Sequence, residues 1–241
     1  MTNPQESTSS RRIAHAAVRS ALIQAAKTEL ASVGSAALSL RAVARSVGMA
    51  PSGVYRYFAS RDDLLTALIL DAYHALGDAV DAAELSHSHD APLDRWRALC
   101  GAIRTWALEN PHEYALIYGS PVPGYHAPDA TTSAALRTLL PLLRLIDLVS
   151  QPVPPARPFE LPPVSDALHA QFQRLDGALP GLTVERMDTA LAAWALLFGQ
   201  INFEVFGRLG EPFENLTELF LHNVDVAAWL VGITNVDGGS S

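Results

Sequence analysis

Two glycines and a proline, at positions 34, 48 and 51, are so close together in the sequence that only short helices can form between and directly after them. Gly34 ends a long run with helical spacing, and Gly48 and Pro51 lie either side of a two-residue break. Glycine readily takes positive φ after a helix, and proline fits a first helical turn, where its missing N–H costs no hydrogen bond. The pattern predicts helices over about 12–33, 40–47 and 51–58. Two short helices joined by such a turn are typical of a helix-turn-helix.

A further helix start follows directly. Ser60 and Asp63 have the spacing of a capping box, which predicts a helix from there to about Leu85. Ser39 stands at the expected N-cap of the 40–47 helix. We expect a small core to fix the short helices against the first one. Its members are Val43, Ala44, Val47, Val54, Phe58 and Leu65.

The rest of the chain also has helical spacing, and alternation typical of strands is not evident. Prolines interrupt it at 120–130 and 151–163, which predicts loops there. The expected helices are 91–109, 111–119, 131–149, 164–178, 183–209 and 213–232. The fold class is therefore all-α, with about nine to ten helices. The expected organisation is a disordered tail over 1–12, a three-helix domain over 13–76 with its helix-turn-helix at about 39–58, a larger helical domain over 77–233, and a tail over 234–241.

Charge is divided unevenly along the chain. Residues 1–61 contain eight Lys or Arg and two acidic residues, whereas the rest contains nine and 23, within a net charge of −8. A basic segment on an acidic chain favours nucleic acid at one end and repels it elsewhere.

Composition narrows the class further. Cys100 is the only cysteine, which excludes an intrachain disulfide and a cysteine-based zinc site. The first ten residues are polar, and uninterrupted apolar runs are shorter than the roughly 18 residues of a membrane span. We therefore expect a cytoplasmic protein without cofactor or metal.

Four pieces of sequence together resemble one family. They are Leu-Ser-Leu-Arg-Ala-Val-Ala at 38–44, Gly48, Val-Tyr-Arg-Tyr-Phe at 54–58, and Ser-Arg-Asp-Asp-Leu-Leu at 60–65. The combination resembles the TetR (tetracycline-repressor-like) family of bacterial transcriptional regulators over about residues 16–76. Trp106, residues 110–125 and residues 194–207 resemble one class of the family's effector domains. The resemblance implies a dimeric DNA-binding regulator that responds to a small molecule.

The resemblance also implies roles at the DNA. Arg41 would lie near phosphates or a guanine edge, Tyr55 near a base methyl or a phosphate, and Tyr57 and Arg61 at phosphates. The full predicted set is Ser39, Arg41, Pro51, Ser52, Gly53, Tyr55, Arg56, Tyr57 and Arg61. The family commonly has His where this chain has Tyr57. Two alternatives stay open: Tyr57 could pack in the core, and Arg56 could simply face solvent.

Two further sets are expected in the second half. Aromatic side chains with a few polar tips are the usual lining of a small-molecule site. The candidates are Trp106, Tyr114, Tyr118, Tyr125, Phe198 and Asn202, for an apolar or aromatic effector. Apolar residues also cover more than one face of the last two helices, which favours a partner surface. Its candidates are Trp194, Phe206, Leu219, Phe220 and Trp229.

The sequence thus predicts a repressor that binds a palindromic double-stranded operator as a homodimer, is released by a small molecule and has no membrane partner. Activation would leave the same pattern. One alternative is a helical ligand-binding or scaffold protein with a degenerate DNA-binding segment. An enzyme is less favoured, because no nucleophile elbow, phosphate-binding glycine loop or His-Glu-x-x-His helix is present. His87, His89 and Asp90 could touch a metal, but solvated histidines are normal at a polar helix end.

Overall fold

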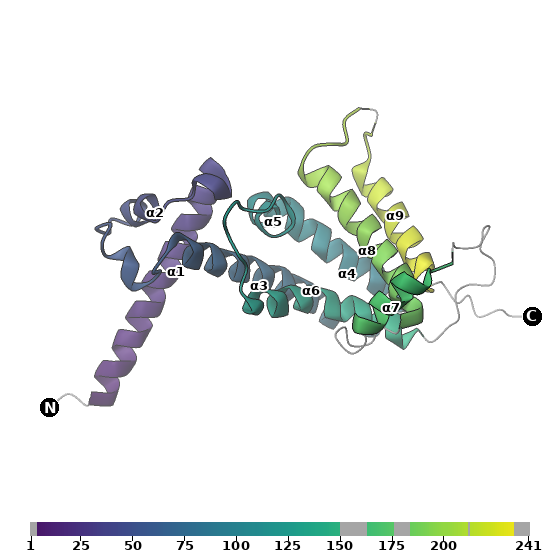
Figure 1. Cartoon of the computed structure of the whole chain (residues 1–241), viewed down its shortest axis with the longest axis horizontal. Coiled ribbons are helices and arrows are strands. Elements are labelled where there is room, and N and C mark those ends of the chain that lie inside the picture. Colours follow the sequence, from purple (N-terminus) through teal and green to yellow (C-terminus); the bar gives the residue numbers. More distant parts are fainter. Residues whose placement is uncertain (1–3, 150–162, 176–183, 212, 234–241) are drawn as a thin grey trace, which may run out of the picture. The chain divides into compact units, whose positions relative to one another are not determined.

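A computed structural model describes residues 4–149, 163–175, 184–211 and 213–233. Within these ranges every regular element is a helix, so the predicted all-α class is confirmed (Figure 1). The predicted loop over 151–163 and the C-terminal tail fall almost entirely outside the described residues. The elements are α1 (Pro4–Ala37), α2 (Leu40–Ser46), the 3₁₀ helix η1 (Val54–Arg56), α3 (Arg61–His87), α4 (Pro92–Glu109), α5 (Pro111–Tyr118), α6 (Asp129–Leu148), α7 (Asp166–Leu175), α8 (Val184–Val205) and α9 (Leu216–Leu230).

The chain divides into two compact units. The first, called the head, comprises residues 1–74 and 110–134; the second, called the body, comprises 75–109 and 135–241. The division after His74 lies close to the boundary expected after residue 76. The inclusion of α5 and the following loop in the head was not expected. Helix α3 begins in the head and continues into the body.

The head has its own apolar core. Leu22 and Ala26 of α1 pack with Val43 of α2, Val54 of η1 and Leu65 of α3. Five of the six predicted core residues are buried, at 2% exposure or less. Val47 is the exception: it is 36% exposed, because α2 ends at Ser46 and Val47 already belongs to the turn.

The predicted helix signals in the head are largely confirmed. Gly34 has φ +75° and Gly48 has φ +70°, the left-handed region that favours glycine. Ser60 and Asp63 form a reciprocal capping box: Ser60 N–H donates to Asp63 Oδ2 at 3.1 Å, and Asp63 N–H donates to Ser60 Oγ at 3.0 Å. Ser39 occupies the N-cap of α2 as expected, but its hydroxyl makes no capping hydrogen bond.

The N-terminus differs from the prediction. Helix α1 begins at Pro4 and runs to Ala37 with a break at Gly34, whereas a tail up to residue 12 was expected. Polar residues alone do not exclude a helix that extends from a stable one, since propagation of a helix is far easier than its nucleation.

In the body, α8 packs along α9, and α4 packs against both (Figure 1). Trp96 of α4 is buried and donates its indole N–H to the carbonyl of Val224 in α9 at 3.0 Å. Arg137 of α6 reaches α3, where its Nη2 is 2.6 Å from both Asp78 Oδ1 and Asp81 Oδ2. A side chain at Gly77 would meet Arg137, because an added Cβ would lie 2.9 Å from Arg137 Cδ.

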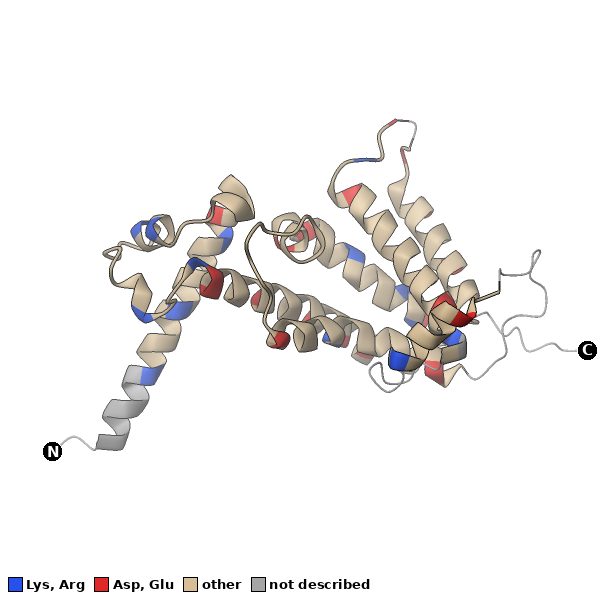
Figure 2. Ribbon diagram, in the orientation of Figure 1, with Lys and Arg blue, Asp and Glu red and all other residues tan. Residues whose placement is uncertain are grey.

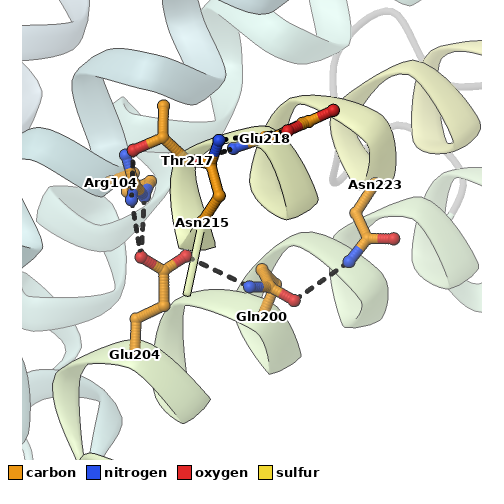
Figure 3. A network of polar contacts seen from close by, with 7 residues as sticks. All are labelled: Arg104, Gln200, Glu204, Asn215, Thr217, Glu218 and Asn223. Atoms are coloured by element: carbon orange, nitrogen blue, oxygen red, sulfur yellow. Dashed lines mark hydrogen bonds and ion pairs between the residues drawn. The ribbon is translucent and has the colours of Figure 1, made fainter. Parts of the chain in front are cut away.

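A polar network joins α4, α8 and α9 in the interior of the body (Figure 3). The Glu204 side chain is 2% exposed and accepts bonds from Arg104 Nε at 2.9 Å and Nη2 at 2.7 Å. Gln200 donates to Glu204 at 3.2 Å and accepts from Asn223 at 2.9 Å. The Arg104 guanidinium also lies 4.9 Å above the Phe220 ring. A buried charge needs such partners, so the network fixes how the three helices meet.

Among the described helices, none combines the length and the apolar character needed to cross a membrane.

Candidate nucleic-acid interface

The helix predicted over 51–58, the second of the helix-turn-helix, is shorter and tighter than expected; its residues 51–58 are called the recognition segment below. Residues 51–53 form a turn and only Val54–Arg56 is helical, as a 3₁₀ helix. Gly53 explains part of this compactness. An added Cβ there would lie 2.9 Å from Met49 Cγ and 3.1 Å from the Ala50 carbonyl oxygen, so a larger residue would require Met49 and the turn to shift. The predicted α-helix over 51–58 is therefore wrong, although Val54 is buried and anchors the segment.

A hollow of about 320 Å³ lies beside this segment. Four of the predicted DNA residues line it together with Ser60. They are Ser39, Arg41, Tyr55 and Arg61. Arg41 is exposed and Tyr55 is 49% exposed, so both can reach a bound molecule. Guanidinium and hydroxyl donors around a hollow suit phosphate oxygens and base edges. Pro51, Ser52 and Arg56 are exposed as well, on the neighbouring turn.

Arg61 has a structural role that the sequence did not suggest. Its Nη2 donates to the carbonyls of Ser35 at 2.6 Å and Ala36 at 3.1 Å, and its Nε donates to Leu38 at 3.1 Å. These carbonyls follow the break at Gly34, in the last residues of α1 and just beyond its end. Arg61 thus attaches the first residue of α3 to the end of α1. Its predicted phosphate contact stays a prediction.

Tyr57 is half-buried, and its ring stacks on that of His15, with centroids 4.6 Å apart and planes inclined by 28°. Arg19, also on α1, lies 5.2 Å from the Phe58 ring centroid. Helix α1 therefore supports both aromatic residues of the segment. This arrangement combines the two alternatives considered for Tyr57, since the ring packs yet remains partly accessible.

Basic side chains are placed to serve this surface. Figure 2 shows Lys and Arg on α1 and α2 of the head. Arg12, Arg19, Arg41, Arg45 and Arg56 are all exposed. Exposed guanidinium groups attract the phosphate backbone and make binding dependent on salt. The head therefore has the shape and charge of a DNA-binding helix-turn-helix domain.

Comparison with known families agrees with this geometry. Residues 22–68 match the family described as "Bacterial regulatory proteins, tetR family", and residues 96–227 match "Tetracyclin repressor-like, C-terminal domain". This chain belongs to the TetR family. The predicted family resemblance is thereby confirmed, and with it a transcriptional regulator with a helix-turn-helix DNA-binding domain rather than an enzyme.

Relatives of this TetR-family chain are regulators too. The HTH-type transcriptional regulators Rv1816 of Mycobacterium tuberculosis and Mb1846 of Mycobacterium bovis are each 39% identical over 214 residues, covering 83% of this chain and 86% of theirs. Among solved structures, SCO4313 is 29% identical with a TM-score of 0.71 and covers 90% of this chain and 97% of its own. A tetR-family regulatory protein from Rhodococcus RHA1, 17% identical with a TM-score of 0.56, covers 90% and 98% and shares the fold.

The predicted effector residues of this TetR-family protein are divided between the two units. Tyr114, Tyr118 and Tyr125 belong to the head, and Trp106, Phe198 and Asn202 belong to the body. In the head, Tyr114 and Tyr118 have ring centroids 5.2 Å apart, and Tyr125 Oη lies 2.9 Å from Thr66 Oγ1. Tyr114 is fully buried, which raises the pKa of its hydroxyl. These tyrosines thus form part of the packing between α3, α5 and the loop after α5.

The predicted interface residues differ in accessibility. Phe206 is 40% exposed, and Trp194, Leu219 and Trp229 are partly exposed. Phe220 is 2% exposed beneath Arg104, so it serves the core of a single chain and is not carried into the interface proposed below.

One contact at the candidate interface, between His15 and Tyr57, has no counterpart in the sequence prediction. His15 was not predicted at the site, and its stacking on Tyr57 has no sequence signal, because the two residues are 42 positions apart.

The His87, His89 and Asp90 alternative gains no support, since the described residues contain no cluster of three or more potential metal ligands. Cys100 is completely buried, which raises the pKa of its thiol and makes it unreactive.

Proposed function

We propose that this TetR-family regulator is a repressor that acts in the cytoplasm, binds a palindromic operator as a homodimer and is released by a small molecule. The observation that carries the proposal is the hollow lined by Ser39, Arg41, Tyr55 and Arg61 beside the recognition segment. It presents donors to phosphates and bases on the basic N-terminal segment, residues 1–61, of an otherwise acidic chain.

Dimerisation is favoured by the reach of one head and by the surface of α8. One short recognition segment contacts few base pairs, so two-fold pairing of heads on a palindrome is the usual solution. Phe203 of α8 is 48% exposed, on the same helix as exposed Ala192 and Ala195, and Phe206 in the turn directly after α8 is 40% exposed. Small residues next to large apolar ones allow helices of two copies to approach closely. We propose that this face pairs with a second copy.

Release by a ligand requires a connection between body and head. Helix α3 provides one, because it starts at Arg61 in the head and ends at His87 in the body. Arg137 ties α6 to the body part of α3 through Asp78 and Asp81. A ligand that moved α6 would therefore act on α3. To convert a mostly bound population into a mostly free one, it must favour one state by several kcal/mol, about 5.5 for a complete reversal.

DNA binding is tested by selection from a random duplex library with the full chain. We expect enrichment of a palindromic sequence, since a symmetric dimer imposes its symmetry on the half-sites. Binding to the enriched duplex should weaken steeply with salt, because each neutralised phosphate releases counterions. A library without an enriched sequence, or a single enriched half-site, would contradict the proposal of a dimeric operator-binding protein.

The interface is tested by sedimentation equilibrium at micromolar concentration. We expect about twice the chain mass of 25.9 kDa for the wild type. Phe203→Glu should shift the population toward the monomer, because it buries a charge in an apolar contact. Leu85→Glu on α3 is the matched control, since Leu85 is 80% exposed and should leave the dimer intact. A wild-type monomer, or equal effects of both variants, would rule out the α8 face.

A further inference from the structure

The body contains an apolar cavity of about 110 Å³ between α4, α6 and α8. Trp96 reaches it from α4, Leu142 and Ile146 from α6, and Ala190, Trp194 and Leu197 from α8. The remaining lining residues are leucine and alanine. None of the residues predicted from the sequence as effector contacts lines this cavity, and Trp194 was predicted at the dimer interface instead. The cavity lies wholly within one unit of the chain.

The lining has no charged side chain and almost no free polar group. Trp96 uses its indole N–H on the Val224 carbonyl at 3.0 Å. The Trp194 ring stacks on Phe198, with centroids 3.8 Å apart. An ionised ligand would have to give up its hydration here without gaining a counter-charge, which is strongly unfavourable. The chemistry of the lining therefore selects against charge.

The cavity is supported rather than left by loose packing. Arg186 of α8 donates from Nη1 to the Ile146 carbonyl at 2.6 Å and from Nη2 to the Val149 carbonyl at 3.2 Å. These bonds satisfy carbonyls at the end of α6 and hold that end against α8. Helices pinned in this way resist collapse onto the space between them. Dry apolar cavities of roughly 150 Å³ are known to take up benzene.

We infer that this cavity is the effector site of the regulator and takes an uncharged, apolar molecule whose buried part is about the size of one ring. The inference rests on the proposed function, because an effector presupposes a regulated operator. It adds the place of the site, its helices and the class of the ligand. Leu191, one of the lining residues, is 45% exposed in the single chain.

The ligand class is tested with toluene and benzoate, which share a ring and differ in charge. Thermal unfolding of the full wild-type chain is followed as each compound is titrated. Toluene should raise the Tm in a saturable manner, because a ligand that binds only the folded state stabilises it. Benzoate should leave the Tm unchanged. An unchanged Tm with toluene, or an equal rise with benzoate, would overturn the inference without reference to DNA.

The place of the site is tested with Ala190→Leu, which fills the cavity with an apolar side chain. The variant should retain its fold and lose the toluene-dependent rise in Tm; an undiminished rise would place toluene elsewhere. If the variant did not fold, the wild-type comparison of the two compounds would still decide the ligand class.

The effector role is tested separately on the duplex obtained by selection. Toluene should change wild-type affinity for this duplex by a factor of roughly 5 to 150, the usual range of coupling between sites, and benzoate should not. Toluene binding without a change in operator affinity would overturn the effector role. Failure to bind any duplex, with the toluene effect on Tm intact, would instead contradict the proposed function and leave the cavity's ligand class standing.

Discussion

Arg41→Ala combined with Tyr55→Ala should reduce affinity for the selected duplex roughly a thousandfold. Both side chains line the hollow beside the recognition segment. A lost contact to DNA costs about 1 kcal/mol at the low end, and the proposed dimer would lose four of them, about 4 kcal/mol in all. The loss is measured by fluorescence anisotropy at fixed salt. Both residues are exposed, so the circular dichroism spectrum and the Tm should stay close to those of the wild type.

Arg45→Ala is the matched control for this experiment. Arg45 lies on the same short helix as Arg41, is exposed and carries the same charge, but it does not line the hollow. Its removal should weaken binding only through the general attraction of phosphates. If Arg45→Ala and Arg41→Ala reduced affinity equally, the hollow would have no special part in recognition. Retained affinity in the double variant would place the DNA contacts elsewhere on the head.

Glu204→Ala should destabilise the chain more than any other single change considered above. It leaves the Arg104 guanidinium, whose side chain is 16% exposed, without its carboxylate. Breaking a buried pair by removing one partner costs about 3–5 kcal/mol. In a protein of this size, that corresponds to a fall in Tm of roughly 6–20 °C. The measurement is thermal unfolding followed by circular dichroism.

Asp225→Ala tests whether the loss of stability in Glu204→Ala comes from the burial of the ion pair or from its hydrogen-bond geometry. Asp225 also accepts two bonds from an arginine, at 2.7 Å and 2.8 Å from Arg97, but these side chains are 43% and 36% exposed. Exposed pairs contribute about 0–1 kcal/mol. The Tm should therefore fall much less than in Glu204→Ala. The double change Arg104→Met with Glu204→Leu should recover much of the loss, because no uncompensated charge remains. Equal falls in Tm for the two carboxylates would contradict a role for burial.

The parts of the fold that sequence predicted well depend on local chemistry. Helices α4 and α5 begin at Pro92 and Pro111, within one residue of the starts expected at 91 and 111, and the Ser60–Asp63 capping box opens α3. Each of these signals involves residues within one helical turn. The recognition segment was predicted less well, because an α-helix was expected over 51–58 and the chain forms a turn followed by the 3₁₀ helix Val54–Arg56. Val54 and Phe58 of this segment are held in the core of the head by residues of other helices, and spacing within the segment does not reveal those contacts.

The candidate site shows the same limit. Arg41 and Tyr55 belong to a recognisable motif, and the structure brings them to one hollow. The stacking of His15 on Tyr57 joins segments far apart in the chain, so no local pattern could have indicated it. For the cavity a signal did exist: Leu139, Leu142, Leu143 and Ile146 repeat at helical spacing on α6. The same spacing of apolar residues is found on helices that pack in an ordinary core. Only the packing of the helices in the structure distinguishes a cavity lining from a filled core.

The hydrogen bonds of Arg61 to the end of α1 have a consequence for the spacing between half-sites that the protein can accept. Because the first residue of α3 is bonded to the end of α1, turning α3 would turn the whole reading surface without altering its internal shape. A base pair inserted at the operator centre rotates the second half-site by about a tenth of a helical turn. In the proposed dimer, a head whose helices are joined in this way would have to follow that rotation as a unit. Half-site phase, as much as base identity, would then decide which duplexes this regulator occupies.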